Sequence, residues 1–289
     1  MAARILEGKT LAAEITAAAK AAAAQAAAKT GRTPRLAALS STDDYASVVY
    51  LKKEIAACEK IGIKAEVFSI TAQTPAAEFI RLVRGLSSSQ DVDAILVPRP
   101  LPKHLSAILL WDNLNPDKDI DAASNMSLGR LFNCKSMSEV EACGGFVPCT
   151  ALAAIKLAQR HNIELAGKET VVLGRSSTVG KPLAHMLSCL DATVTLCHSR
   201  TRNLEEVIRR ADVVFSAIGK ARFIKAGMIK PGATVIDIGT NQDENGVFCG
   251  DVDTAAVSEV AGAVSPVPGG VGPITLSLLL HNIAAAANK

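Results

Sequence analysis

Apolar runs and amphipathic segments alternate along the first half of the chain. The apolar runs have the length and composition of strands, and they lie at residues 35–39, 65–70 and 92–97. The segments between them have helical periodicity, at residues 46–61 and 76–86. Strands that alternate with helices predict a parallel sheet. An alanine-rich stretch at 11–28 comes first, and its thin apolar stripe of Leu11 and Ile15 predicts a packed surface helix.

The same alternation restarts after Pro148. Predicted strands lie at residues 170–173, 193–197, 213–217 and 234–238. Predicted helices lie at residues 150–161, 180–190 and 204–210. A stretch rich in glycine and proline, 265–273, then leads to an apolar helix at 274–287. The pattern therefore predicts an α/β protein with two parallel-sheet units, and it does not decide which unit the last helix packs on.

Composition narrows the class of partner. The chain has 289 residues, enough for two domains, and its 49% hydrophobic and 20% charged residues are typical of globular proteins. The 31 Lys and Arg against 28 Asp and Glu leave a net charge of only +3. Nucleic-acid and membrane-surface proteins carry larger basic excesses, so we expect a small-molecule partner.

The cysteines indicate a reducing compartment. There are seven, an odd number, and no two form a C-x-x-C pair. This favours free thiols over a disulfide framework or a zinc site, and we assign no metal. The N-terminus lacks the long apolar region of a secretory signal, and no apolar run reaches the roughly 18 residues that span a membrane. We therefore expect a cytoplasmic protein.

A glycine-containing turn follows the predicted strand at 170–173. It places Gly174, Arg175, Ser176, Val179 and Gly180 between that strand and a helix. Backbone N–H groups at such a helix N-terminus can hold a pyrophosphate. Ser176 occupies the place of the second glycine of the standard G-x-G-x-x-G, so an ordinary tight turn is the alternative.

The ends of the next strands carry further nucleotide signals. An enzyme that uses NAD has an acid about 20 residues after the turn, whereas this chain has His198, Ser199 and Arg200 there. A guanidinium and a hydroxyl suit the 2′-phosphate of NADP, and a solvated basic loop is the alternative. Gly219, Ile238 and Thr240 lie at the carboxyl ends of the last two predicted strands, where an open α/β sheet binds its ligand.

Several segments together carry a family resemblance. The densest is Pro-Val-Pro-Gly-Gly-Val-Gly-Pro-Ile-Thr at 266–275, and the others lie at 116–121, 148–150 and 174–182. In order and spacing, from about Gly8 to His281, the chain resembles the bifunctional methylenetetrahydrofolate dehydrogenase/methenyltetrahydrofolate cyclohydrolase family. The resemblance implies NADP-dependent oxidation of methylenetetrahydrofolate in one-carbon metabolism.

The resemblance also implies a domain arrangement. Residues 1–149 plus 274–289 would form a catalytic folate-binding domain, and residues 150–273 a Rossmann-like NADP domain, with a folate cleft between the two. It further implies a homodimer formed through the nucleotide domains. By this likeness Tyr50 stacks on the folate, Asp121 holds the pterin ring and Thr275 contacts the nucleotide. The implied folate-binding residues near the C-terminus are Pro268, Gly269, Gly270, Gly272 and Pro273.

Two positions depart from the family pattern. The Tyr-x-x-x-Lys motif begins at Tyr50, but Glu54 stands where the lysine belongs, and Pro98 stands where its partner glutamine belongs. Hydride transfer is driven by the folate nitrogen lone pair and needs mainly positioning, whereas hydrolysis of the methenyl cation needs acid–base catalysis. We therefore expect a dehydrogenase whose cyclohydrolase activity is weak or lost.

Other interpretations of the exchange stay open. In one, the enzyme is fully bifunctional because Lys53, on the same helix face as Tyr50, or Glu54 itself serves as a substitute base. In another, Glu54 alters the preferred substrate, or pairs with Arg99 in a structural role. In a third, the chain is a catalytically silent folate-binding subunit.

Overall fold

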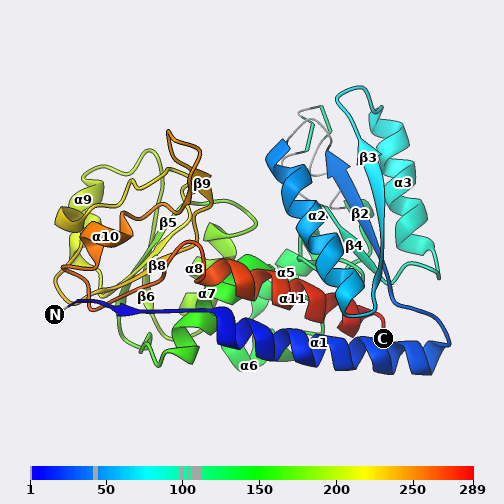
Figure 1. Cartoon of the computed structure of the whole chain (residues 1–289), viewed down its shortest axis with the longest axis horizontal. Coiled ribbons are helices and arrows are strands. Elements are labelled where there is room, and N and C mark those ends of the chain that lie inside the picture. The colour runs from blue at the N-terminus through cyan, green and yellow to red at the C-terminus, as the bar shows by residue number, and fades with distance from the viewer. Residues whose placement is uncertain (1, 42–44, 98–100, 103, 106–111) are drawn as a thin grey trace. The chain divides into compact units, whose positions relative to one another are not determined.

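The computed structural model describes residues 2–41, 45–97, 101–102, 104–105 and 112–289, with the backbone alone at 41 and 45–50. The chain forms two compact units (Figure 1). Unit 1 comprises Met1–Ala12, Phe132–Cys143 and Pro148–Thr275. Unit 2 comprises Ala13–Leu131, Gly144–Val147 and Leu276–Lys289. The predicted α/β class with two parallel sheets is confirmed.

Unit 2 contains the sheet predicted for the first half of the chain. Its strands β2 (Arg35–Ser41), β3 (Lys64–Ile70) and β4 (Ala94–Leu96) pair in parallel in the order β3-β2-β4. The crossover helices are α2 (Tyr45–Lys60) and α3 (Ala76–Ser88). Residues 36–39 of β2 are all buried, so both faces of the sheet are covered. Phe79 and Val83 of α3 pack on one of these faces.

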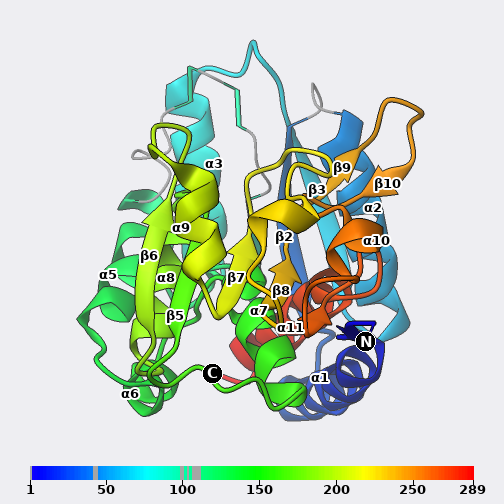
Figure 2. The same ribbon diagram turned by 90° about the vertical axis from the view of Figure 1, so that its left-hand side faces the viewer.

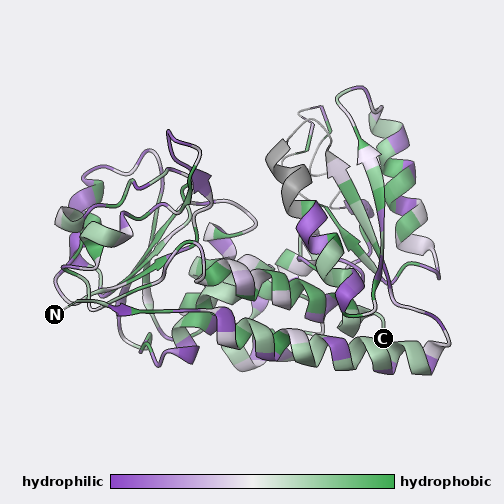
Figure 3. Ribbon diagram, in the orientation of Figure 1, coloured by the Kyte–Doolittle hydropathy of each residue, from purple (hydrophilic) through white to green (hydrophobic). Residues whose placement is uncertain are grey.

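Two long helices, α1 (Lys9–Thr30) and α11 (Val271–Ala286), begin in unit 1 and end in unit 2. Within unit 2 the buried stripe of α1 consists of Ala19, Ala23 and Ala26, whereas the predicted stripe of Leu11 and Ile15 is only half-buried. Alanine permits close approach of a neighbouring helix. Two hydrogen bonds join α1 to α11 and the residues that follow it. Thr16 Oγ1 donates to Ser277 Oγ (2.9 Å), and Asn288 Nδ2 donates to the Ala22 carbonyl (3.0 Å). In Figure 3, α11 is mostly green, whereas α1 alternates pale green with purple, hydrophilic positions.

Unit 1 is built on a six-stranded parallel sheet in the order β1-β11-β8-β7-β5-β6. The four predicted strands are confirmed as β5 (Glu169–Leu173), β6 (Thr193–Cys197), β7 (Val213–Ser216) and β8 (Thr234–Asp237), and Figure 2 shows them side by side. The three predicted helices are α7 (Cys149–Arg160), α8 (Gly180–Ser188) and α9 (Leu204–Arg210).

Short elements of unit 1 have no counterpart in the sequence pattern. They are β1 (Arg4–Ile5), β11 (Ala263–Val264), the hairpin of β9 (Asn241–Gln242) and β10 (Phe248–Cys249), α5 (Asn125–Asn133, shared with unit 2), α6 (Met137–Ala142), η1 (Ala226–Met228) and α10 (Thr254–Val257). Because β1 pairs with β11, the first residues of the chain belong to unit 1. The domain boundaries expected above, 1–149 plus 274–289 and 150–273, stay a prediction, whereas the contacts place 1–12 and 132–143 in unit 1.

The strand order creates a switch point in the sheet of unit 1. The chain passes from β5 to β6 on one side and then returns to β7 on the other side of β5. The crevice at the carboxyl ends of β5 and β7 is where open α/β sheets bind ligands. Among the described residues, no helix is long and apolar enough to cross a bilayer.

Close packing at this switch point generates a testable prediction. A Cβ on Gly180 would collide with the backbone oxygen of Gly174, because the first turn of α8 rests on the end of β5. We expect Gly180→Ala to destabilise unit 1 by about 1–3 kcal/mol and to lower the thermal unfolding midpoint. Gly85→Ala, in an open position of α3, is the control and should leave that midpoint unchanged or raise it. An unchanged midpoint for Gly180→Ala would contradict this packing.

Candidate functional site

The turn after β5 is shaped by two glycines and one serine. Gly174 has φ +110°, in the region that favours glycine, and its backbone lies close to the Ala217 carbonyl at the end of β7. Ser176 Oγ accepts hydrogen bonds from the N–H groups of Val179 (3.1 Å) and Gly180 (3.3 Å). Ser176 therefore has a local role at the start of α8, which explains a serine at the place of the second glycine.

This turn has the free donors that a phosphate requires. Within the described residues, the backbone N–H groups of 175–178 donate to no protein acceptor. They precede the N-terminus of α8, whose dipole favours negative charge. The turn therefore fits the pyrophosphate of a dinucleotide.

The loop after β6 is held by its own side chains. Thr201 Oγ1 accepts a hydrogen bond from the His198 N–H (2.9 Å), and His198 Nδ1 accepts one from the Arg200 N–H (3.1 Å). Ser199 and Arg200 are exposed, and no protein acceptor binds the Arg200 guanidinium among the described residues. The loop therefore presents a hydroxyl and a cation to solvent at the carboxyl end of β6.

A buried carboxylate, Asp251, fixes the loops after β7 and β8. It is fully buried and accepts four hydrogen bonds. The donors are Ser216 Oγ (3.0 Å), the N–H groups of Ile218 (2.8 Å) and Lys220 (2.9 Å), and Asn241 Nδ2 (2.9 Å). Two of these donors flank Gly219, so Asp251 sets the path of the backbone at this predicted nucleotide residue.

A second buried carboxyl group, Asp237, supports the first. It ends β8 and accepts hydrogen bonds from the N–H groups of Gly239 (2.9 Å), Asp251 (3.0 Å) and Val252 (2.9 Å). Burial raises the pKa of Asp237 to about 7, although the three N–H donors act in the opposite direction. Ile238 and Thr240 follow directly, so both predicted residues lie on a segment held by this pair of acids.

The sequence interpretation missed Asp237 and Asp251 as positioning groups. Two signals were available. Asp237 interrupts the apolar run at 234–238, and Gly250 precedes Asp251. A Cβ on Gly250 would collide with the Asp237 carboxyl group, so the glycine marks a close approach.

The loop after β11 carries the residues of the 266–275 motif. Gly269 has φ +114° and its carbonyl accepts a hydrogen bond from the Gly8 N–H (2.8 Å). Gly270 N–H donates to the Pro266 carbonyl (2.9 Å), and Thr275 lies in the first turns of α11. Pro268, Gly272 and Pro273 lie on the same segment of unit 1.

The remaining predicted catalytic residues lie in unit 2. Tyr50, Lys53 and Glu54 all belong to α2, where Lys53 is exposed and Glu54 is half-buried. The Tyr50 side chain, Pro98 and Arg99 lie outside what the structure describes. The predictions for these three stay untested.

Asp121 comes near Glu54 on a turn that another acid holds. The Asp119 carboxylate is buried and accepts hydrogen bonds from the N–H groups of Ala123 (2.8 Å) and Ser124 (2.7 Å). Ala122, which directly precedes these two donors, has φ +50°, a conformation that costs a residue with a side chain some free energy. Asp119 therefore overcomes the cost of the turn that presents Asp121.

The pKa of Glu54 is unusually high for a glutamate. Burial, and secondly the charge of Asp121, raise the pKa of Glu54 to about 7. Glu54 is therefore poised to gain or lose a proton near neutral pH. Among the described residues, no group of three His, Cys, Asp or Glu side chains is arranged to hold a metal ion.

Comparison with known proteins identifies the family. Residues 6–121 match the catalytic domain of tetrahydrofolate dehydrogenase/cyclohydrolase, and residues 148–289 match its NAD(P)-binding domain. The chain belongs to the tetrahydrofolate dehydrogenase/cyclohydrolase family. The resemblance seen in the sequence is thereby confirmed, and unit 1 contains the family's NAD(P)-binding sheet.

Individual relatives match over nearly the whole chain. The bifunctional protein FolD of Elusimicrobium minutum is 55% identical over 285 residues, which cover 99% of each chain. The crystal structure of the FolD dehydrogenase/cyclohydrolase from Campylobacter jejuni has a TM-score of 0.91 at 36% identity, covering 99% of each chain. The Trypanosoma brucei enzyme, solved with NADP and an inhibitor, has a TM-score of 0.90 at 30% identity, covering 100% of this chain and 98% of that one.

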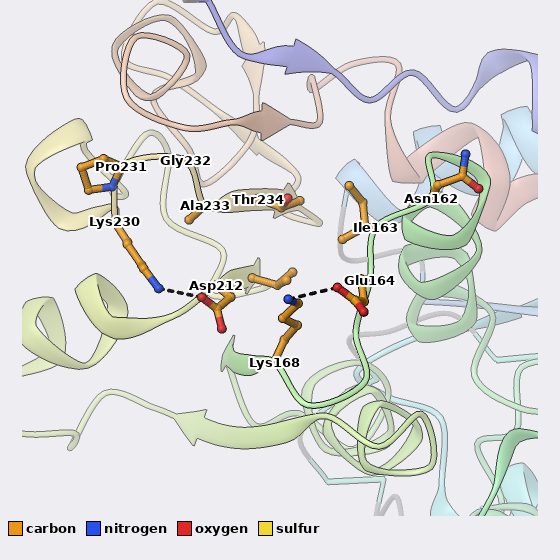
Figure 4. Close-up of a pocket in the computed structure, with 11 residues that line it drawn as sticks. Asn162, Ile163, Glu164, Lys168, Asp212, Lys230, Pro231, Gly232, Ala233 and Thr234 are labelled. Atoms are coloured by element: carbon orange, nitrogen blue, oxygen red, sulfur yellow. Dashed lines mark hydrogen bonds and ion pairs between the residues drawn. The ribbon is translucent and has the colours of Figure 1, made fainter.

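A separate pocket of about 300 Å³ lies at the amino ends of the strands of the unit 1 sheet, opposite the carboxyl ends that carry the turns (Figure 4). Its lining includes the amino ends of β7 and β8, away from the turns described above. Two ion pairs neutralise its charged groups, Lys168 with Glu164 (3.0 Å) and Lys230 with Asp212 (2.6 Å). None of the residues predicted from the family motifs lines it.

The role of Asp251 is testable by one substitution. Asp251→Asn places an amide NH₂ against donors that need an acceptor, so we expect a loss of stability of about 2–3 kcal/mol and weaker NAD(P) binding. Glu244→Gln, at an exposed position of the β9–β10 turn, is the control and should leave both unchanged. Calorimetric titration with NADP and thermal unfolding provide the readouts. Unchanged NADP affinity in a folded Asp251→Asn variant would contradict the positioning role.

Proposed function

We propose that this chain oxidises methylenetetrahydrofolate to methenyltetrahydrofolate with NADP as the hydride acceptor, in one-carbon metabolism, and that it hydrolyses the methenyl product weakly or not at all. The observation that carries the proposal is a contrast between the two units. The nucleotide turns of unit 1 have their donors and supports in place, whereas Glu54 in unit 2 is a half-buried carboxyl group where the family resemblance implies an amine.

The preference for NADP rests on the loop after β6. Exposed Ser199 and Arg200 offer a hydroxyl and a guanidinium, and this loop has no acid to bind a ribose 2′-hydroxyl. A guanidinium binds a phosphate through two parallel hydrogen bonds. His198 keeps the loop in place by accepting the Arg200 N–H.

Hydride transfer makes modest demands on the protein. When bound, NADP supplies the hydride acceptor, and the folate nitrogen lone pair supplies the driving force. The residues of the chain have to hold the two reactants face to face, which is the expected task of Tyr50, Asp121 and the segment from Pro268 to Thr275.

Hydrolysis of the methenyl cation makes a stronger demand, because a water molecule has to be activated and protons moved. A lysine amine at position 54 would be a cation beside Asp121, whereas Glu54 makes an acidic pair with it. Pro98 has no side-chain donor or acceptor to support either group. These differences support weak or absent cyclohydrolase activity.

A second candidate function has one observation in its favour. A general base works best when its pKa lies near the working pH, and the pKa of Glu54 is about 7. A fully bifunctional enzyme would then use Glu54 as the substitute base. The exposed position of Lys53 favours Glu54 over Lys53 in that role.

Two further proposals concern assembly, which the family resemblance implies, and cellular location, which the cysteines indicate. We propose that the chain acts as a homodimer joined through its nucleotide domains, and that it works in the cytoplasm. The seven cysteines, free in this structure, support a reducing compartment.

The NADP preference is tested by Arg200→Ala. Loss of a charge-assisted contact to the 2′-phosphate should lower kcat/KM for NADP by about 10- to 100-fold and leave the value for NAD almost unchanged. Arg210→Ala, an exposed arginine at the end of α9, is the matched control and should change neither. Equal losses with both cofactors would contradict the assignment.

The role of position 54 is tested by assaying both reactions on three variants. We expect hydride transfer by the wild-type chain, little catalysed decay of methenyltetrahydrofolate, and no further loss of that decay in Glu54→Gln. Glu54→Lys should increase hydrolysis, up to about a hundredfold if the amine alone limits it.

Lys53→Gln is the control next in the chain and should alter neither activity. Rapid hydrolysis by the wild-type chain that Glu54→Gln abolishes would overturn the main proposal and establish the second candidate. Absence of hydride transfer with both cofactors would overturn both.

A further inference from the structure

The pocket in Figure 4 lies in unit 1, and the residues that line it take no part in the proposed dehydrogenase reaction. Its lining comes from the loop between α7 and β5, the start of β7 and the loop that leads into β8. The Asp212 N–H donates to the Glu169 carbonyl (2.8 Å), and the Thr234 N–H donates to the Asp212 carbonyl (2.9 Å). The sheet therefore fixes the three segments that surround the pocket.

The inner ion pair of the pocket is a fixed part of its wall. Lys230 Nζ lies 2.6 Å from Asp212 Oδ1, and Asp212 Oδ2 accepts a hydrogen bond from the Glu169 N–H (3.0 Å). These two hydrogen bonds, the one from Lys230 first, lower the pKa of Asp212, so this carboxylate stays charged at neutral pH. Both of its oxygens have protein donors, and the pair is not free to exchange partners.

The outer ion pair is free to exchange. Lys168 Nζ lies 3.0 Å from Glu164 Oε2, and the two side chains are 38% and 73% exposed. Among the described residues, the Glu164 carboxylate has no other protein partner. An exposed ion pair of this kind contributes little stability, so little is lost when it opens. Lys168 and Glu164 can therefore turn to the opposite charges of a ligand.

The rest of the lining limits the kind of ligand. Between the charged groups lie four apolar residues, namely Ile163, Val213, Pro231 and Ala233. Two cations and two anions give the pocket no net charge, so a ligand with a single charge is repelled by half of these groups. A volume of about 300 Å³ is at the lower end of the range for ligand pockets and is too small for a dinucleotide. The complementary ligand is a small zwitterion with an apolar body.

We propose that this pocket is a second binding site, and that it takes a neutral α-amino acid with an aliphatic side chain. The ligand carboxylate binds Lys168, and the ligand ammonium group binds Glu164. One ion pair within the protein is thereby exchanged for two ion pairs with the ligand. The aliphatic side chain packs on the apolar residues of the lining.

The test uses L-leucine as the probe, in calorimetric titrations of the full chain. Two analogues separate its charges, since 4-methylpentanoate lacks the ammonium group and 3-methylbutylamine lacks the carboxylate. We expect one equivalent of leucine to bind, and each analogue to bind about tenfold more weakly because one charged contact is lost. Saturating NADP should leave the leucine affinity unchanged, because the nucleotide turns lie at the carboxyl ends of the strands.

Variants assign the site. Lys168→Met and Glu164→Gln should each weaken leucine binding about tenfold. Lys225→Met is the matched control, because it breaks another exposed ion pair of unit 1, with Asp253 (3.0 Å), and should leave leucine binding unchanged. All three variants should keep the wild-type thermal unfolding midpoint.

Four results would overturn the proposal. They are the absence of saturable leucine binding at millimolar concentrations, an analogue that binds as tightly as leucine, competition between leucine and NADP, and an equal loss of leucine affinity in the Lys225→Met control.

Discussion

Buried carboxylates at the carboxyl end of the unit 1 sheet are the constraint on which the nucleotide site depends. Asp251 gathers donors from the ends of two strands, and Asp237 in turn accepts the Asp251 N–H. A buried acid is costly unless its oxygens are filled by donors, and here backbone N–H groups supply most of them. Loops that would otherwise be mobile therefore keep one path, and the predicted residues Gly219, Ile238 and Thr240 lie on those loops.

The same device recurs in unit 2. Asp119 holds two consecutive N–H groups and thereby the left-handed Ala122, and the next carboxyl group along the turn is Asp121. Its charge adds to burial in raising the pKa of Glu54 to about 7. In both units, acids placed for structural reasons set the conformation or the protonation of the groups proposed to act. The difference is that unit 1 presents donors suited to a phosphate, whereas unit 2 presents a carboxyl pair.

The sequence predicted the features that arise locally or in long periodic segments. The strands around Leu36–Leu39 and Val171–Leu173, and the turn at Gly174, follow from neighbouring residues. A strand of two residues such as Arg4–Ile5 is too short to show an alternation of apolar and polar residues. It forms only because a partner strand lies beside it. Asp251 was missed because its donors lie as far as 35 residues away in the chain. The raised pKa of Glu54 depends on its burial and secondly on Asp121, which lies 67 residues further along the chain, so no local pattern could reveal it. The buried face of α1 could not be predicted either, because alanines occur on all its faces and the buried Ala19 and Ala23 do not differ in type from the exposed ones.

The account of position 54 depends most on Glu54 being a carboxyl group that burial and Asp121 keep titrating near neutral pH, at a position where the family resemblance implies an amine. This is measured most directly by ¹³C NMR of the full chain labelled at the glutamate side-chain carboxyl carbon, with Glu54→Gln used to assign the resonance. The environment of Glu54 predicts a titration midpoint of about 7 in the absence of ligand, well above the ordinary value of 4.5. A midpoint at the ordinary value would contradict it, because Glu54 would then be a solvated surface acid that neither Asp121 nor burial affects.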